Sequence, residues 1–143
     1  MERWMVFAAI SMLFAGATSV VAKRGLEGIS GEVGLFVRTL FVTAFVLAFA
    51  AAAIPRGQLS KVEGSNLYWL GISGATTAAS WVFYYKALKD GNVATVALID
   101  KGSFVVAVVL AWLLLGERIT PRVLTGCAFI LAGLLIVARK RAV

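Results

Sequence analysis

The sequence predicts an all-α integral membrane protein, a bundle of five transmembrane helices. Of its 143 residues, 61% are hydrophobic and 15% are charged, whereas a soluble domain is nearer half apolar and a quarter charged. The apolar residues form five runs, each near the roughly 20 residues with which a helix crosses about 30 Å of hydrocarbon. These runs occupy most of the chain and leave no soluble domain.

The five predicted spans cover residues 4–22, 33–54, 67–88, 93–115 and 123–138. Pro55, Gly91 and Pro121 fall at their boundaries, where a helix begins or ends. The connections are short, so consecutive helices should be antiparallel neighbours. No linker divides the chain, and we therefore expect one transmembrane domain over residues 1–143.

The first span could be mistaken for a secretory signal, because Ala15, Gly16 and Ala17 imitate a cleavage site. The apolar run continues to Ala22, and the residues before it are nearly neutral. The first span is therefore expected to stay in the mature protein.

The second and fourth spans contain charged residues. If the fourth span enters hydrocarbon near Val93, Asp100 and Lys101 lie roughly 10–12 Å deep, and Arg38 lies roughly 7 Å into the second span. Positions three and four residues from Asp100 hold no base, so its partner is expected on another helix. We predict an Arg38–Asp100 contact with Lys101 directed at a wet cavity, because charges facing lipid cost several kcal/mol. A bridge that only locks two helices is the alternative.

The third span is rich in small and hydroxyl-bearing residues. Gly71, Ala75 and Ala79 recur at a spacing of four, which suits close helix packing or a polar path. An aromatic cluster follows near the membrane boundary, where it forms either an aromatic belt or a surface on which an organic solute stacks. The residues that we assign to a substrate pathway here are Ser73, Thr76, Thr77, Ser80, Trp81 and Tyr84.

The fifth span places Gly126 and Gly133 seven residues apart on one face. Glycines at this spacing make a flat seam for a close helix neighbour. That neighbour is either a helix of the same chain or a second copy across a dimer interface.

The distribution of bases predicts the orientation. An odd number of spans places the termini on opposite sides, and the positive-inside rule favours an outside N-terminus and an inside C-terminus, although insertion both ways round stays open. The N-terminal side has five bases, Arg3, Arg56, Lys61, Arg118 and Arg122, and the C-terminal side has seven, Lys23, Arg24, Lys86, Lys89, Arg139, Lys140 and Arg141.

Composition also excludes several kinds of function. With one cysteine, Cys127, and no histidine, the chain offers no disulfide, no Cys/His metal site and no catalytic triad. We expect neither an enzyme nor a bound cofactor or metal. The net charge of +7 lies at the ends of apolar runs, where it sets topology and does not indicate nucleic-acid binding.

Two segments carry a family resemblance, FYYKALKDGNVATVALIDKGSFVVAVVLAWLLLGERIT (83–120) and TGCAFILAGLLIV (125–137). In order and spacing they resemble the EamA domain of the drug/metabolite transporter superfamily. That family's common form has ten spans in two such domains, which implies that this chain is similar to one half. The last helix is also similar to that of small multidrug resistance exporters, which implies that Gly126 and Gly133 form an association seam.

One departure concerns proton coupling. Those exporters use a glutamate in the first helix, whereas the first span here offers only Ser11, Thr18 and Ser19. The resemblance therefore does not extend to proton coupling through the first helix. The acid that lies well inside a span is Asp100.

The sequence thus favours a multi-pass carrier of small organic solutes in a bacterial inner (plasma) membrane. It would act as a homodimer, or as a heterodimer with another EamA-type half, by alternating access. The alternative is a non-transporting membrane subunit that assembles with or regulates a larger complex.

Overall fold

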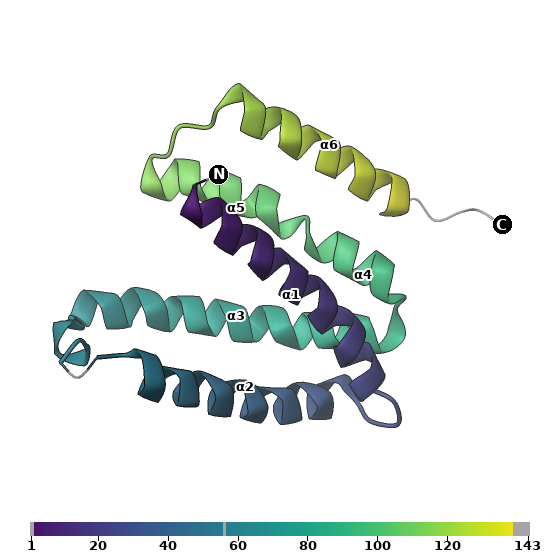
Figure 1. Ribbon diagram of the computed structural model, residues 1–143. Coiled ribbons are helices and arrows are strands. Elements are labelled where there is room, and N and C mark those ends of the chain that lie inside the picture. The colour runs from purple at the N-terminus through teal and green to yellow at the C-terminus, as the bar shows by residue number, and fades with distance from the viewer. Residues whose placement is uncertain (1, 56, 139–143) are drawn as a thin grey trace. The chain divides into compact units, whose positions relative to one another are not determined.

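A computed structural model describes residues 2–55 and 57–138, and all regular elements in these ranges are helices (Figure 1). In chain order they are α1 (Arg3–Gly25), α2 (Gly31–Ala53), the short 3₁₀ helix η1 (Leu59–Lys61), α3 (Gly64–Asp90), α4 (Val93–Asp100), α5 (Ser103–Leu115) and α6 (Pro121–Ala138). The predicted all-α fold is confirmed for these ranges, although the fourth of the five predicted spans is divided between α4 and α5.

Local signals set the helix ends. The side chain of Ser30 accepts a hydrogen bond from the backbone N–H of Val33 at the start of α2. At the start of α4, the side chain of Asn92 accepts from two backbone N–H groups. These oxygens satisfy donors that a helix N-terminus leaves unpaired. After α5, Gly116 adopts the left-handed conformation (φ 66°), which glycine tolerates and which ends a helix.

Three of the predicted spans are long and apolar enough to cross a membrane: Arg3–Gly25, Gly31–Ala53 and Val93–Leu115. The protein is therefore a multi-pass membrane protein. Helix α3 has 27 residues, about 40 Å at 1.5 Å per residue, but its serines and threonines make it less apolar. Helix α6 has an apolar stretch, Pro121–Val137, that is shorter than the other three. Membrane crossing by α3 and α6 stays a prediction.

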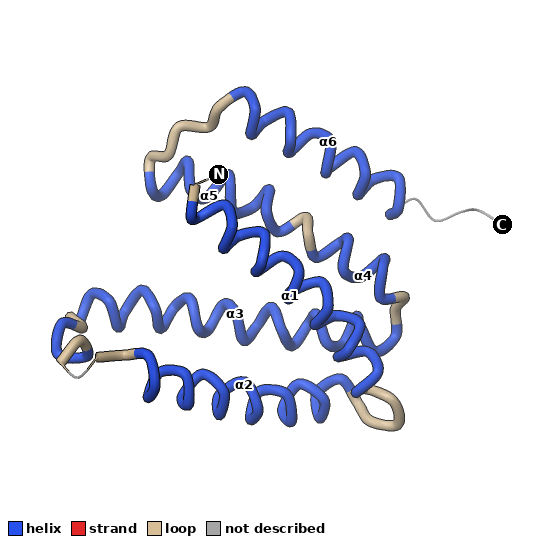
Figure 2. Tube along the Cα trace, in the orientation of Figure 1, coloured by secondary structure: helices blue, strands red, loops and turns tan. Residues whose placement is uncertain are grey.

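The fourth span is not one continuous helix, which differs from the sequence-based expectation. Figure 2 shows a non-helical step between α4 and α5. The N–H of Gly102 bonds to the carbonyl of Ile99, and the N–H of Val105 bonds to that of Gly102, so contacts over three residues occur at the step. Glycine is a weak helix former, and an ideal Cβ on Gly102 would lie 3.0 Å from the Ile99 oxygen and 3.2 Å from Cδ2 of Leu134.

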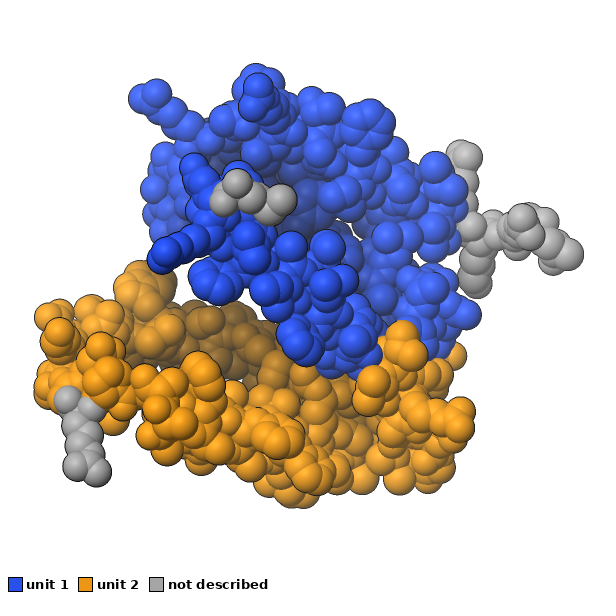
Figure 3. Space-filling model, viewed as in Figure 1, with its two compact units in different colours: residues 1–19, 91–143 blue, residues 20–90 orange. Residues whose placement is uncertain are grey.

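The chain forms two compact units, which Figure 3 colours separately. One unit contains residues 1–19 and 91–143, and within it α4 packs against α6. The other contains residues 20–90, in which α2 and α3 lie side by side and antiparallel. The division falls inside α1, after Ser19, and the single domain expected from the sequence stays a prediction.

At one end of the unit formed by residues 20–90, two lysine side chains donate hydrogen bonds to backbone carbonyls. Lys23 Nζ donates to the carbonyl oxygens of Leu88 and Lys89, at 2.7 and 2.8 Å, and Lys89 Nζ donates to that of Leu26 at 3.0 Å. The last carbonyls of a helix lack partners within it, so Lys23 caps α3 while Lys89 fixes the loop before α2. Leu26 and Leu88 are buried beside these contacts.

Candidate functional site

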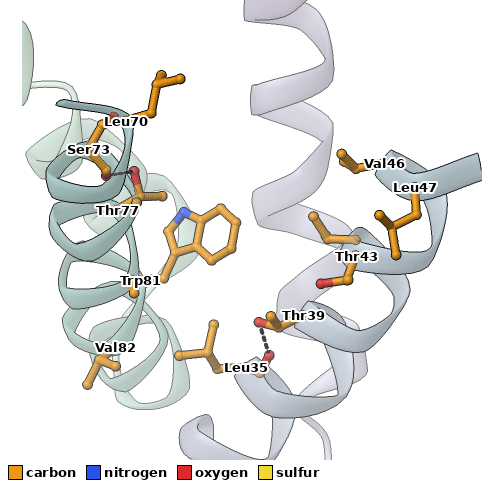
Figure 4. Close-up of a pocket in the computed structure, with 13 residues that line it drawn as sticks. Leu35, Thr39, Thr43, Val46, Leu47, Leu70, Ser73, Thr77, Trp81 and Val82 are labelled. Atoms are coloured by element: carbon orange, nitrogen blue, oxygen red, sulfur yellow. Dashed lines mark hydrogen bonds between the residues drawn. The ribbon is translucent and has the colours of Figure 1, made fainter. Parts of the chain in front are cut away.

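A groove runs between α2 and α3 and has a volume of about 600 Å³ (Figure 4). Its size falls in the range of small-molecule sites. Both walls follow helical spacing, since residues three or four apart share a face. Helix α2 contributes Leu35, Thr39, Val42, Thr43, Val46 and Leu47, and α3 contributes Leu70, Ser73, Gly74, Thr77, Ala78, Trp81 and Val82.

Two threonine hydroxyls in the groove donate to their own helices. Thr39 Oγ1 donates to the carbonyl of Leu35, and Thr77 Oγ1 donates to that of Ser73, both at 2.8 Å. A hydroxyl that has used its proton in this way still has acceptor lone pairs. The two oxygens can therefore accept hydrogen bonds from N–H or O–H groups of a solute, while the rest of the wall is largely apolar.

Trp81 links the groove to Arg38, a partly buried arginine of α2. Its indole points from α3 into the space between the two helices (Figure 4). The guanidinium carbon of Arg38 lies 4.4 Å from the centroid of the Trp81 ring and 5.8 Å from that of Tyr85. Both distances are within the range of cation–π attraction. Arg38 Nη1 is buried and has no hydrogen-bond partner among the described residues.

The predicted pathway residues of α3 divide into two groups. Ser73, Thr77 and Trp81 line the groove, whereas Thr76, Ser80 and Tyr84 are absent from its walls. Thr76 instead donates to the carbonyl of Ser73 at 2.9 Å, and the Tyr84 ring lies edge-on to that of Tyr85.

Sequence reasoning missed the threonines of α2. Thr39 and Thr43 line the groove opposite α3. Their spacing of four residues matches that of Ser73 and Thr77, so paired hydroxyls on two spans that are antiparallel neighbours could have identified them.

Asp100 and Lys101 form an ion pair where α4 ends, with Lys101 Nζ 3.7 Å from Asp100 Oδ2. The expectation that no base in the same span reaches Asp100 was therefore wrong. It considered only positions three and four residues away, whereas the adjacent lysine reaches back at the step between α4 and α5. Since Arg38 belongs to the other unit, the Arg38–Asp100 contact stays a prediction.

The glycine face of α6 is open within its own unit. Among the described residues of that unit, no atom beyond the helix's own nearby backbone and the neighbouring residues lies within 4 Å of an ideal Cβ on Gly126 or Gly133. The same face is therefore available to another helix.

Acidic residues do not gather into a metal site in the parts of the chain that the structure describes, 2–55 and 57–138. No group of three or more His, Cys, Asp or Glu side chains is placed to hold an ion. Glu32 instead pairs with Lys86, with 3.3 Å between Oε1 and Nζ, near the loop before α2.

Comparison with known proteins adds a family match to this geometry. The model of a family described as EamA-like transporters matches residues 2–139. A protein of Sinorhizobium sp. described as "Uncharacterized transporter in cobO 3'region" is 36% identical over 137 residues, which cover 96% of this chain and 97% of that protein. No solved structure matches the chain.

Proposed function

The chain belongs to the EamA-like transporter family, and from this membership we propose that it carries small organic solutes across a bacterial inner membrane. The family points to a membrane transporter and away from an enzyme.

The groove between α2 and α3 is the observation that carries this proposal. It combines a largely apolar wall, the Trp81 indole and the acceptor oxygens of Thr39 and Thr77. Sites for small molecules are typically apolar concavities with a few placed polar groups. A groove of this kind suits an organic solute better than a bare inorganic ion, for which a ring of charges or carbonyls would be needed.

The interrupted fourth span supports a transport role. Transporter sites are commonly built where transmembrane helices are discontinuous near the middle of the bilayer. The step between α4 and α5 has an acid–base pair, Asp100 and Lys101, within an otherwise apolar span. We assign this pair to the polar part of the pathway.

We further propose that two copies act together and that α6 joins them. A single chain of this family type corresponds to one half of the ten-span form that it resembles. Five helices alone would enclose little space for a solute pathway. The open glycine face at Gly126 and Gly133 would let the α6 helices of two copies approach closely. Alternating access would then arise as one bundle rocks against the other. An outside N-terminus and an inside C-terminus are the orientation that the bases favour.

The test is solute flux through the purified protein in proteoliposomes, with a panel of labelled anionic, neutral and cationic organic solutes. We expect saturable uptake of at least one class, above that of protein-free vesicles. Absence of flux for every class, together with copurification of a larger partner, would favour the non-transporting subunit instead.

A further inference from the structure

We propose that Arg38 is the anion-binding residue of the groove, and that the solute is a small organic carboxylate whose apolar body lies against Trp81. This inference deepens the proposed function and depends on it for its transport role, but binding can be tested without transport.

Arg38 places a positive charge inside an apolar span. An arginine guanidinium is a permanent cation in proteins. Arg38 lies about 10 Å along α2 from Gly31, inside one of the three spans that are apolar enough to cross a membrane. A permanent cation at such a position needs an anionic or strongly polar partner.

The contacts within its own unit do not provide that partner. Trp81 and Tyr85 offer ring faces, which attract the charge but do not accept a directed N–H bond in the plane of the guanidinium. Glu32, an acid on the same helix, is engaged by Lys86. Arg38 Nη1 is consequently a buried donor with no acceptor among the described residues.

The position of this donor next to the groove indicates the chemistry of the acceptor. Arg38 lies three residues after Leu35 and four before Val42, both of which line the groove, so helical spacing puts it on the same face. Trp81 contacts the guanidinium and also lines the groove. A carboxylate fits the fork geometry of arginine, and a group attached to it would extend along the indole into the apolar part.

The hydroxyls refine the class of solute. Thr39 and Thr77 line the groove and each donate to a backbone carbonyl, so their oxygens keep lone pairs that can accept from a solute. A carboxylate with an aromatic or aliphatic body and an O–H or N–H group would satisfy the cation, the apolar wall and these oxygens together.

Calorimetric titration of the full-length protein in phosphatidylcholine nanodiscs tests this inference. The two probes are 4-hydroxyphenylacetate and its amide, which have nearly the same shape but differ in charge. We expect the acid to bind at least about tenfold more tightly than the amide, equivalent to about 1.4 kcal/mol. Arg38→Gln should weaken binding of the acid by a similar factor and leave binding of the amide unchanged, which brings the ratio of the two affinities close to one.

Two further variants separate a binding role from a structural one. Arg38→Lys keeps the charge but loses the fork, and its acid-to-amide ratio should fall between those of the wild type and Arg38→Gln. Arg24→Gln removes an exposed arginine that pairs with Glu27 and should leave the ratio unchanged. If Arg38→Gln does not fold, the acid-to-amide affinity ratios of the wild type and of Arg38→Lys still test the inference.

Three outcomes would overturn the inference. The first is a wild-type acid-to-amide affinity ratio near one, which is also expected if Asp100 neutralises Arg38, and the second is an unchanged ratio in Arg38→Gln. The third is loss of acid binding in phosphatidylglycerol nanodiscs, which would assign the site to a lipid headgroup. Flux distinguishes this inference from the proposed function. Transport of other solutes without carboxylate binding would contradict the inference alone, whereas carboxylate binding without any flux would contradict transport and support the inference.

Discussion

Gly31 lies directly against the backbone of Tyr85: an ideal Cβ on Gly31 would be 2.9 Å from the Tyr85 carbonyl oxygen and 3.1 Å from its carbonyl carbon. Backbone atoms of α3 cannot move aside as the end of a flexible side chain can. The start of α2 and the last turns of α3 therefore meet through a glycine, and this contact sets the separation of the helices at one end of the groove.

Gly31→Ala should destabilise the protein by about 1–3 kcal/mol, because the added methyl group overpacks this contact. The measurement is thermal unfolding in detergent. Gly71→Ala is the matched control in α3, since no atom of another described element lies within 4 Å of its ideal Cβ, and it should be neutral or stabilising by up to about 1 kcal/mol. Equal melting of Gly31→Ala and the wild type would contradict the close contact.

Lys23→Met should loosen the end of α3. Lys23 Nζ donates to the carbonyls of Leu88 and Lys89, and methionine keeps the length of the side chain but donates nothing. Leaving part-buried carbonyls without a donor costs about 1–3 kcal/mol. Hydrogen exchange of the amides around residues 88–92 should accelerate by at least about fivefold, whereas Lys61→Met, at the exposed η1 helix, should leave it unchanged. Unaltered exchange in Lys23→Met would show that water replaces the lysine at little cost.

How far the sequence predicts this fold depends on which signal each element provides. The helices follow from apolar runs separated by turn-forming residues, and Gly91 and Pro121 mark boundaries that the structure reproduces. The step at Gly102 was missed because a run of 23 apolar-rich residues predicts one uninterrupted helix. The adjacent Asp100, Lys101 and Gly102 were the available signal of a break in the helix, but only the charges of Asp100 and Lys101 were considered.

The site was predictable on one wall and not on the other. Hydroxyl-bearing and aromatic residues stand out in α3, and three of those that the sequence singled out, Ser73, Thr77 and Trp81, line the groove. Helix α2 is apolar over most of its surface, which obscures the periodicity that normally identifies a buried face, and the four-residue spacing of Thr39 and Thr43 was therefore overlooked. The unpaired donor of Arg38 is a property of the folded state, since a sequence gives charge but not hydrogen-bond partners.

Asp100→Asn should reduce flux by at least about tenfold. The change removes the charge that faces Lys101 at 3.7 Å, and an unpaired base within a span costs several kcal/mol. Flux is measured over a range of pH in proteoliposomes, with Glu117→Gln as a control in the exposed loop after α5. Full transport with unchanged pH dependence in Asp100→Asn would remove this acid from the mechanism.

Replacing both Gly126 and Gly133 with leucine should separate the proposed dimer. Bulky side chains would prevent close approach at a face that is open within its own unit. Subunit counting by single-molecule photobleaching in vesicles should change from two copies to one. Ala128→Leu, two residues along α6 and pointing away from Gly126, should leave two copies. A dimer that persists in the double variant would exclude this seam.

The most direct measurement of the central claim, that solute moves along the groove between α2 and α3, is flux through Trp81→Ala compared with Phe83→Ala in proteoliposomes. Trp81 lines the groove, whereas the exposed Phe83 does not. For a solute that the wild type transports, the account predicts that Trp81→Ala lowers kcat/KM by about tenfold, which corresponds to about 1.4 kcal/mol of lost aromatic contact, while Phe83→Ala stays near the wild-type value. Equal flux in Trp81→Ala and the wild type, with both proteins folded, would contradict it.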